Sequence, residues 1–428
     1  MRRKTRGSIG IALAAALSLG IAACGGDDGD SSSTPETEAP SDGGDTGGDT
    51  GGDTGGDTGG EKFSLANFTA WEDLPAEAGG LASSPVIDCA PDDGPLKAAW
   101  VYVGPINDGG WTQAHNESRE AAQAHFGDAI ETTYKENVPE GPQVLQVIED
   151  LIADGNTYIV GTSFGFQDAF AEAAGSHPDV CFEFATGFLS APNLSQFYGS
   201  AEDTDYLTGM AAGAASESGK LGIIAAFPIP EVVRGVNAWT MGARATNPDA
   251  EVTLLWTNTW FDPALERKSA EQLIADGADV IGVKSQDSPA SGDAAAAAGV
   301  PWAGYDSDQS ANYPEVWLTA TTYHWDVYHI PRIQAALDGN WIAGNYYGAL
   351  NDEFVKLAPY GKIVAQETID AIEAKKAEFS EKPGSMFCGP LNDNKGTEQL
   401  AAGVCHTFGE LMSMMYLVEG VNGEIPAG

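Results

Sequence analysis

Two tryptophans stand at matching places in the two halves of the chain and give the strongest indication of chemistry. Trp111 ends the run Gly104–Trp111, and Trp260 lies in the run Thr257–Pro263; each run follows a β-rich segment and precedes a helical pattern. Stacking of a base on an aromatic side chain contributes about 1 to 3 kcal/mol. The pair therefore predicts a site that holds a flat ring from both faces. The alternative is that each indole fills a core at a helix start.

Carboxylates and amides near the same predicted strand ends could select among flat rings. Asp306 and Asp308 follow one strand, and Asn107 and Asp108 precede Trp111. Carboxylates accept hydrogen bonds from a ribose diol, from ring N–H groups or from exocyclic amines. One Asp could instead cap the following helix. A Mg²⁺ or Ca²⁺ site would need more oxygen ligands, and we expect neither a metal nor another cofactor.

Four further residues are candidates for ligand contact. Ser163 and Phe166 lie in a strand-end segment with a turn glycine, and Phe166 fits a core equally well. Glu231 begins a helix, where a carboxylate also offsets the helix dipole. Trp325 lies where the chain should pass back between the halves, so it lines a cleft or pads a hinge.

Patterns typical of catalysis are missing from the sequence. There is no Gly-x-Ser-x-Gly elbow and no phosphate loop, and the six histidines are scattered. The sequence predicts a binding protein rather than an enzyme.

The elements that must position these residues form two similar sets of alternating strands and helices, the pattern of a parallel sheet covered by helices. In the first set we expect strands at 98–103, 130–136, 158–161 and 180–185, and helices at 111–126, 142–153 and 167–174. After a helix at 206–216, the second set has strands at 221–227, 251–256, 280–284 and 301–305, and helices at 230–245, 263–275 and 290–298.

Roughly 280 residues in two α/β sets exceed what one core usually serves, so we expect two lobes with a cleft between them. Open α/β sheets bind ligands beyond the carboxyl ends of their strands. The strand-end loops of both sets are therefore the expected walls of the site.

The first 23 residues have the pattern of an export signal. Four basic residues precede an apolar stretch from Ile9 to Ala23, and small residues stand before Cys24. This arrangement resembles a bacterial lipobox, which implies cleavage before Cys24 and diacylation of its sulfur. Two acyl chains anchor a protein stably in a membrane. The alternative is an ordinary signal peptide followed by a chance cysteine.

Residues 25–60 lack aromatic and basic residues, contain ten acidic ones and repeat Gly-Gly-Asp-Thr from Gly43 to Gly60, which favours an extended tether. The formal net charge is −41, and removing the four basic residues of the signal leaves −41 − 4, or −45. Nucleic acid is excluded as a partner because binding it needs a basic stripe.

Four cysteines follow Cys24 and allow three pairings. Export makes disulfides the expected state. Cys388 and Cys405 bracket a loop rich in Gly, Pro and Asn, so we pair them, and Cys89 then pairs with Cys181.

Several ordered motifs resemble the basic membrane protein (BMP) family over about residues 96–380. They are Gly104–Pro105 with Asp108–Trp111, Glu136–Gly141, Thr162–Gly165, Phe227–Gly235 and Asn258–Pro263. The resemblance implies substrate-binding lipoproteins of ABC importers, a type I periplasmic-binding-protein fold with three crossovers, and purine ligands. It also implies that Trp111 and Trp260 stack on the ligand and that Asp306 or Asp308 grips ribose or base. The Trp-type loop is similar to that of adenine-binding members.

These inferences give a domain plan and a set of partners. We expect a signal peptide at 1–23, a lipidated tether at 24–60, an N-terminal extension at 61–95 and a C-terminal extension at 381–428. Lobe 1 should comprise 96–203 plus about 318–345, and lobe 2 should comprise 204–317 plus about 346–380. We expect a monomer on the outer face of the cell membrane, held there only by its lipid and working with an ABC permease and its ATPase.

Three alternatives remain open at this point. One is a receptor for a sugar, an amide or an aromatic amine on the same fold. Another is a surface nucleoside hydrolase that uses Asp306 and Asp308. The third is a sensory lipoprotein that reports its ligand to a signalling partner.

Overall fold

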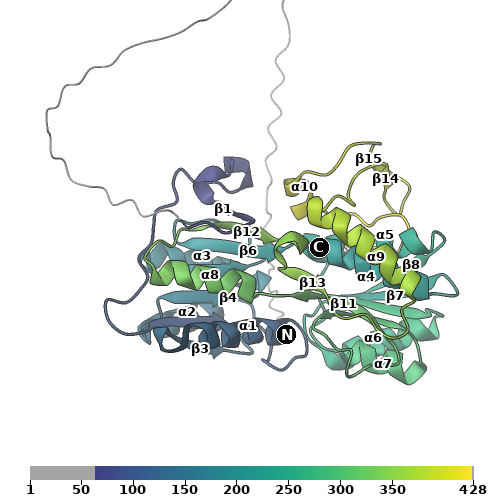
Figure 1. Ribbon diagram of the computed structural model, residues 1–428, viewed down its shortest axis with the longest axis horizontal. Helices are drawn as coiled ribbons and strands as arrows, with labels where there is room; N and C mark the ends of the chain where they lie inside the picture. The colour runs from purple at the N-terminus through teal and green to yellow at the C-terminus, as the bar shows by residue number, and fades with distance from the viewer. Residues whose placement is uncertain (1–62, 427–428) are drawn as a thin grey trace, which may run out of the picture. The chain divides into compact units, whose positions relative to one another are not determined.

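The computed structural model describes residues 63–426, and these contain two seven-stranded sheets (Figure 1). The predicted signal peptide, Cys24 and the acidic tether lie outside the described residues. The first sheet has the order β1 (Phe68–Ala70), β12 (Gly344–Gly348), β6 (Leu194–Gly199), β5 (Cys181–Ala185), β4 (Tyr158–Gly161), β2 (Leu96–Val101) and β3 (Ile130–Lys135). The second has the order β13 (Val355–Leu357), β11 (Trp317–Tyr323), β10 (Trp302–Asp306), β9 (Val280–Lys284), β7 (Lys220–Ala225), β8 (Glu251–Trp256) and β16 (Val421–Asn422).

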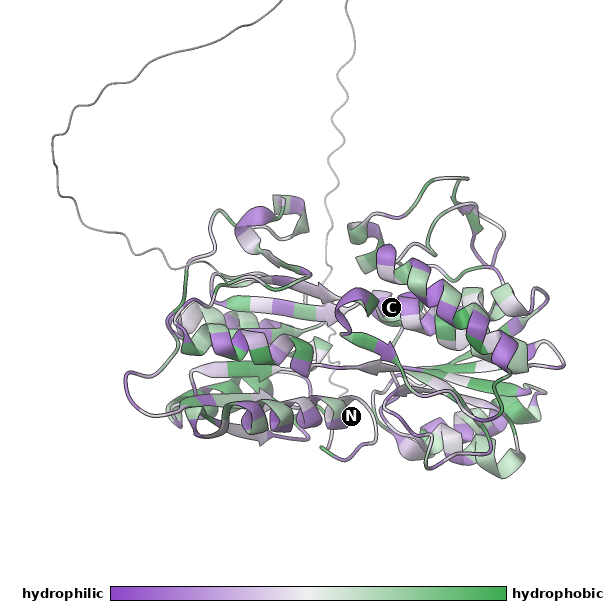
Figure 2. Ribbon diagram, viewed as in Figure 1, coloured by the Kyte–Doolittle hydropathy of each residue, from purple (hydrophilic) through white to green (hydrophobic). Residues whose placement is uncertain are grey.

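Helices cover both sheets and define two lobes. Lobe 1 carries α1 (Trp111–Phe126), α2 (Gln143–Ala153), α3 (Gln167–Ser176) and α8 (Asp326–Leu337). Lobe 2 carries α4 (Ala201–Ala215), α5 (Pro230–Thr246), α6 (Pro263–Ala275), α7 (Ala290–Ala298) and α9 (Gln366–Glu381). Figure 2 shows hydrophobic residues concentrated in the strands and a mixed surface on α9, where Ile372 and Phe379 are buried.

Both lobes repeat one topology. In lobe 1 the strands run β3-β2-β4-β5-β6 and in lobe 2 they run β8-β7-β9-β10-β11, all parallel. In each lobe the first strand lies between the second and the third, so the strand order reverses beside it. Such a switch point opens a crevice at the carboxyl ends of the strands. The predicted fold class is confirmed.

The chain passes between the lobes at three places: between β6 and α4, between β11 and α8, and between β12 and β13. Residues 318–323, expected in lobe 1, belong to lobe 2, because β11 pairs with β10 and β13 in the second sheet. The chain re-enters lobe 1 after Tyr323. The helix expected at 206–216 begins earlier, at Ala201.

The N-terminal extension is part of lobe 1. β1 pairs antiparallel with β12, and the indole nitrogen of Trp71 donates to the carbonyl oxygen of Leu194 at 2.9 Å. Cys89 forms a disulfide with Cys181, and Cys388 forms one with Cys405. Both predicted pairings are confirmed.

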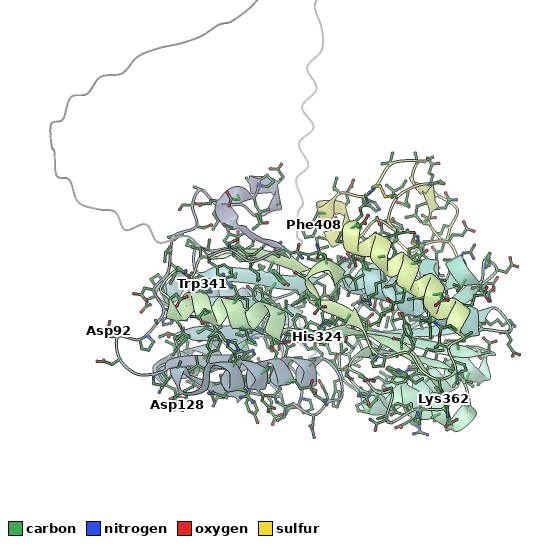
Figure 3. The ribbon with its side chains drawn as sticks, in the orientation of Figure 1. Asp92, Asp128, His324, Trp341, Lys362 and Phe408 are labelled. Carbon is green, nitrogen blue, oxygen red and sulfur yellow. A yellow bond between two sulfur atoms is a disulfide. The ribbon has the colours of Figure 1, made fainter. Side chains whose placement is uncertain are left out.

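The C-terminal extension docks on lobe 2, which the sequence did not reveal. It contains β14 (Leu391–Asn392), β15 (Glu398–Leu400) and α10 (Phe408–Met412), and β16 pairs with β8 at the edge of the second sheet. Asn237 of α5 donates to the carbonyl oxygen of Tyr416 at 2.8 Å and accepts from the backbone N–H of Val418 at 2.9 Å. Phe408, labelled in Figure 3, packs edge to face against Tyr347 of β12 at 5.0 Å between ring centroids, so the extension also contacts lobe 1.

Replacing Asn237 should loosen this extension without unfolding the lobes. Asn237→Ala removes two hydrogen bonds to the backbone of the extension, one of them buried, which should lower the local opening free energy of residues 411–421 by about 1 to 3 kcal/mol. Hydrogen exchange of those amides measures the change. Gln272→Ala, which removes an exposed amide bonded within α6, is the matched control. Equal protection in both variants would contradict the docking role of Asn237.

Candidate functional site

A pocket with an empty volume of about 330 Å³ lies where the switch points of the two sheets face each other. Lobe 1 lines it with residues that follow β2, β4 and β5: Val103, Trp111, Thr162, Ser163, Phe164 and Thr186. Lobe 2 lines it with residues that follow β7, β8 and β9: Glu231, Trp260, Ser285 and Asp287. This is the expected position of a ligand in an open α/β sheet.

Trp111 forms one wall of the pocket and is held from behind. It is the first residue of α1, and its indole nitrogen donates to the carbonyl oxygen of Thr162 at 2.6 Å. Its ring meets Trp325 edge to face at 5.0 Å, and Trp325 is stacked between His115 at 4.0 Å and Tyr323 at 4.5 Å. The aromatic packing fixes the orientation of Trp111, so its ring is a preformed surface for stacking.

Trp260 lines the pocket from lobe 2 and reaches lobe 1. Its ring packs against Phe227 with centroids 4.7 Å apart, and its indole nitrogen donates to Oε1 of Glu140 at 3.2 Å. The same oxygen of Glu140 accepts from the Ser163 hydroxyl at 2.6 Å and from the backbone N–H of Gly165 at 2.9 Å. Glu140 thus ties the strand-end loops of the two lobes together at the pocket wall.

Buried carboxyl groups gather on the lobe 2 side. Burial raises the pKa of Asp287 well above its ordinary value, and the nearby charges of Asp108 and Asp306 add to the effect. Burial likewise raises the pKa of Asp306 well above the usual range, with Lys284 opposing. Among the described residues, neither carboxylate oxygen of Asp306 has a hydrogen-bond partner. Asp306 does not line the pocket, whereas Asp287 does, and the buried carboxyl group of Asp287 favours a ligand that brings hydrogen-bond donors.

The cation nearest to these acids is already engaged. The ammonium group of Lys284 forms an ion pair with Asp205 at 2.8 Å and donates to the hydroxyl of Tyr305 at 2.6 Å. That hydroxyl lies 3.0 Å from the hydroxyl of Tyr323. A negatively charged ligand would find little uncompensated positive charge here.

Glu231 is linked to the hinge by a second chain of hydrogen bonds. The Tyr198 hydroxyl donates to Oε1 of Glu231 at 2.6 Å and lies 2.7 Å from the Tyr323 hydroxyl. Burial raises the pKa of Glu231, and Lys284 and the bond from Tyr198 oppose the rise. Tyr198 belongs to the first sheet and Glu231 to lobe 2, so this bond crosses between the lobes.

The backbone is unusual at the same strand ends. Thr186, Ser285 and Asp306 have φ values of 65°, 56° and 65°, in the left-handed region that non-glycine residues rarely occupy. The hydroxyl oxygens of Thr186 and Ser285 are buried without a partner among the described residues. Such strain concentrates where a side chain must point at a ligand.

The other predicted site residues lie elsewhere. Phe166 is fully buried in the core beneath α2 and α3, and Trp325 is buried behind Trp111. Asn107 and Asp308 are exposed, and Asp308 accepts from the backbone N–H of Ser310 at 2.9 Å. The carboxylate of Asp108 accepts backbone N–H groups at the start of α1.

The strand-end loops that the sequence offered as walls of the site contain Asp287, Glu140, Thr162, Phe164, Thr186 and Ser285, but none of these was singled out for ligand contact, and Val103 was expected to end a strand. Their signal was position alone, because each follows a parallel strand or stands in the loop after it.

Across residues 63–426, no group of three or more His, Cys, Asp or Glu side chains is suited to a metal ion. The same range contains no helix with the length and apolar character needed to cross a membrane.

Relatives and solved structures agree with this architecture. The chain is 35% identical over 331 residues to a purine-binding protein of Brucella abortus, covering 77% of this chain and 94% of the relative. It is also 35% identical over 333 residues to a proposed glucose-binding protein of an ABC transporter in Haloferax volcanii, covering 78% and 82%. A nucleoside-binding protein of an ABC transporter in Lactococcus lactis is 22% identical over 172 residues, covering 40% and 46%.

A solute-binding protein of Aeropyrum pernix has the same fold with a TM-score of 0.60 at 17% identity, covering 70% of this chain and 93% of that one. One from Conexibacter woesei has a TM-score of 0.55 at 21% identity, covering 67% and 96%. Residues 96–385 match the family described as ABC transporter substrate-binding protein, PnrA-like. Its members are substrate-binding proteins rather than enzymes, and they act outside the cytoplasm. The chain belongs to this family, which is the BMP family indicated by its strand-end motifs.

Proposed function

We propose that this protein captures a purine, of the adenine type, between Trp111 and Trp260 and delivers it to an ABC permease. The observation that carries the proposal is the placement of one indole from each lobe on the same small pocket. A planar heterocycle can stack on both walls at once, which rewards closure of the lobes around it. The purine-binding and nucleoside-binding relatives support the same class of ligand.

The polar groups favour adenine within that class. Adenine offers an exocyclic amine and a ring N–H as donors, and Asp287 and Glu231 line the pocket with acceptors. We propose a free base in preference to a nucleoside, because the loop that carries Trp260 resembles that of adenine-binding members of the family.

A sugar is the second candidate, and one specific observation favours it. The proposed glucose-binding relative is as similar to this chain as the purine-binding one. Carboxylates also accept hydrogen bonds from sugar hydroxyls. The pocket walls are aromatic, with Trp111, Phe164 and Trp260, and this favours a flat ring over a sugar. A thermal-shift assay with adenine, adenosine, inosine and D-glucose separates the two candidates.

Delivery and anchoring complete the proposal. Closure of the lobes on the ligand gives the permease a distinct form to recognise. We propose that Cys24 carries the lipid that keeps the protein near the permease. Host cells grown with a radiolabelled fatty acid should label the natural protein and leave Cys24→Ser unlabelled, as autoradiography of the immunoprecipitated proteins measures. Equal labelling of both proteins, or no labelling of the natural protein, would contradict a lipid anchor at this thiol.

Removing one stacking wall should weaken capture. Trp260→Ala should cost about 1 to 3 kcal/mol of adenine binding, which is a loss of roughly 5-fold to 150-fold in affinity by calorimetry. Trp256→Ala is the control, because the Trp256 indole donates to the backbone of Glu424 in the C-terminal extension and does not line the pocket. Unchanged affinity in Trp260→Ala would remove this residue from the site.

The unpartnered carboxylate of Asp306 should carry a stability cost that depends on pH. Its pKa in the folded protein lies well above the ordinary 3.8, so the folded state binds the proton more tightly than the unfolded state. Stability is then highest below pH 3.8 for this group and falls as the pH rises through the folded pKa. Asp306→Asn should stabilise the protein on the alkaline side by on the order of 1 kcal/mol.

Denaturant unfolding of the Asp306→Asn variant at a series of pH values measures this effect. The gain over the natural protein should grow as the pH rises from 4 to 9. Asp308→Asn, an exposed neighbour, should leave the profile unchanged. A loss of stability in Asp306→Asn at all pH values would show that the carboxylate is satisfied in solution.

A further inference from the structure

Two adjacent glycines of lobe 1, Gly109 and Gly110, contact lobe 2 beside the pocket. A Cβ atom on Gly110 would lie 2.9 Å from the Cα atom of Asp287 and 2.9 Å from its carbonyl oxygen. Both are backbone atoms at a buried strand end, so they cannot move to relieve the clash as the end of a flexible side chain can. The two lobes can meet here only because Gly110 has no side chain.

Gly109 makes a second contact with lobe 2. Its φ of 89° lies in the region that favours glycine, and a Cβ there would lie 2.8 Å from Cδ of Pro289. Its carbonyl oxygen accepts hydrogen bonds from the hydroxyl of Ser307 and from the side-chain amide of Gln309, the latter at 3.0 Å. These bonds join the loop after β2 of lobe 1 to the loop after β10 of lobe 2.

The loop that carries the glycine pair is fixed in shape by Asp108. Its carboxylate accepts the backbone N–H groups of Gly110 at 2.9 Å, Thr112 at 2.8 Å and Gln113 at 3.0 Å. Asp108 is buried, so these bonds are shielded from water. These bonds hold the loop in the shape that contacts lobe 2, and order of this kind in a loop lowers the entropy cost of closure.

Asp287 belongs to both surfaces. Its side chain lines the pocket, and its backbone is the surface on which Gly110 rests. A ligand that positions Asp287 therefore also positions the docking surface for lobe 1. Neither glycine lines the pocket, and the contact that they make with lobe 2 affects binding through closure.

We propose that Gly109 and Gly110 form a closure latch that determines how tightly the protein holds its ligand without touching it. The proposal rests on the proposed function in one respect, namely that the lobes close around the ligand. A side chain at position 110 holds the lobes apart and lowers the population of the closed form. Because apparent affinity scales with the population of the competent form, binding weakens in proportion.

Gly110→Ala tests the latch with adenine as the probe. Calorimetry should show at least a tenfold loss of affinity, with a melting temperature close to that of the natural protein. The control is Gly175→Ala, since Gly175 of α3 is exposed and a Cβ there meets nothing within 4 Å. Ser307→Ala, which removes one hydrogen bond to Gly109, should lower affinity severalfold. This variant tests the latch if Gly110→Ala fails to fold. Affinities equal to that of the natural protein in Gly110→Ala and Ser307→Ala would overturn the latch.

A distance measurement separates failure of the latch from failure of the purine assignment. Spin labels at Asp128→Cys of lobe 1, labelled in Figure 3, and at Lys268→Cys of lobe 2 report the distance between exposed positions, in a Cys24→Ser background. Adenine should shorten this distance in the natural sequence and in Gly175→Ala, but much less in Gly110→Ala.

If D-glucose alone shortens the distance in the natural sequence, the purine assignment fails and D-glucose becomes the probe for the latch. If neither compound binds, the ligand-free distances decide, because the latch predicts a longer mean distance in Gly110→Ala. Identical ligand-free distributions in that case would overturn it.

Discussion

The structure depends most on an excess of buried hydrogen-bond acceptors where the parallel strands of lobe 2 end. Glu231, Asp287 and Asp306 all have raised pKa values because they are buried, and Lys284 is already engaged by Asp205. Burying such groups costs free energy unless donors reach them. Lobe 1 supplies one donor, the Tyr198 hydroxyl, and a ligand rich in N–H groups can supply others. Ligand binding and contact between the lobes therefore both bring hydrogen-bond donors to the same buried acceptors.

The repeated topology explains why these buried acceptors lie at a cleft. Each sheet reverses its strand order beside its first strand, and the two reversals face each other across one small pocket. The extensions at the two ends of the chain act at a distance from it. β1 pairs with β12 at the edge of the first sheet and β16 pairs with β8 at the edge of the second. Both cover strand edges that would otherwise be open to pairing with another chain.

The sequence predicted the elements better than the side-chain roles. The bounds of α1, α6 and α7 were predicted to the residue, because Trp111, Pro263 and the alanine run ending at Ala298 mark them locally. Phe166 and Trp325 were candidates for ligand contact yet lie in the interior, since local sequence does not tell which face a ring presents. Asp108 caps α1 while Asp287, not singled out, lines the pocket. Docking of the C-terminal extension depends on pairs such as Asn237 and Tyr416, far apart in sequence.

The most direct test of this account is a crystal structure of the protein grown with adenine. The account predicts density for one flat bicyclic ring between Trp111 and Trp260, with its amine directed at the carboxylates of lobe 2. Adenine bound outside the interlobe pocket, or a pocket that admits D-glucose and leaves adenine in solution, would contradict it.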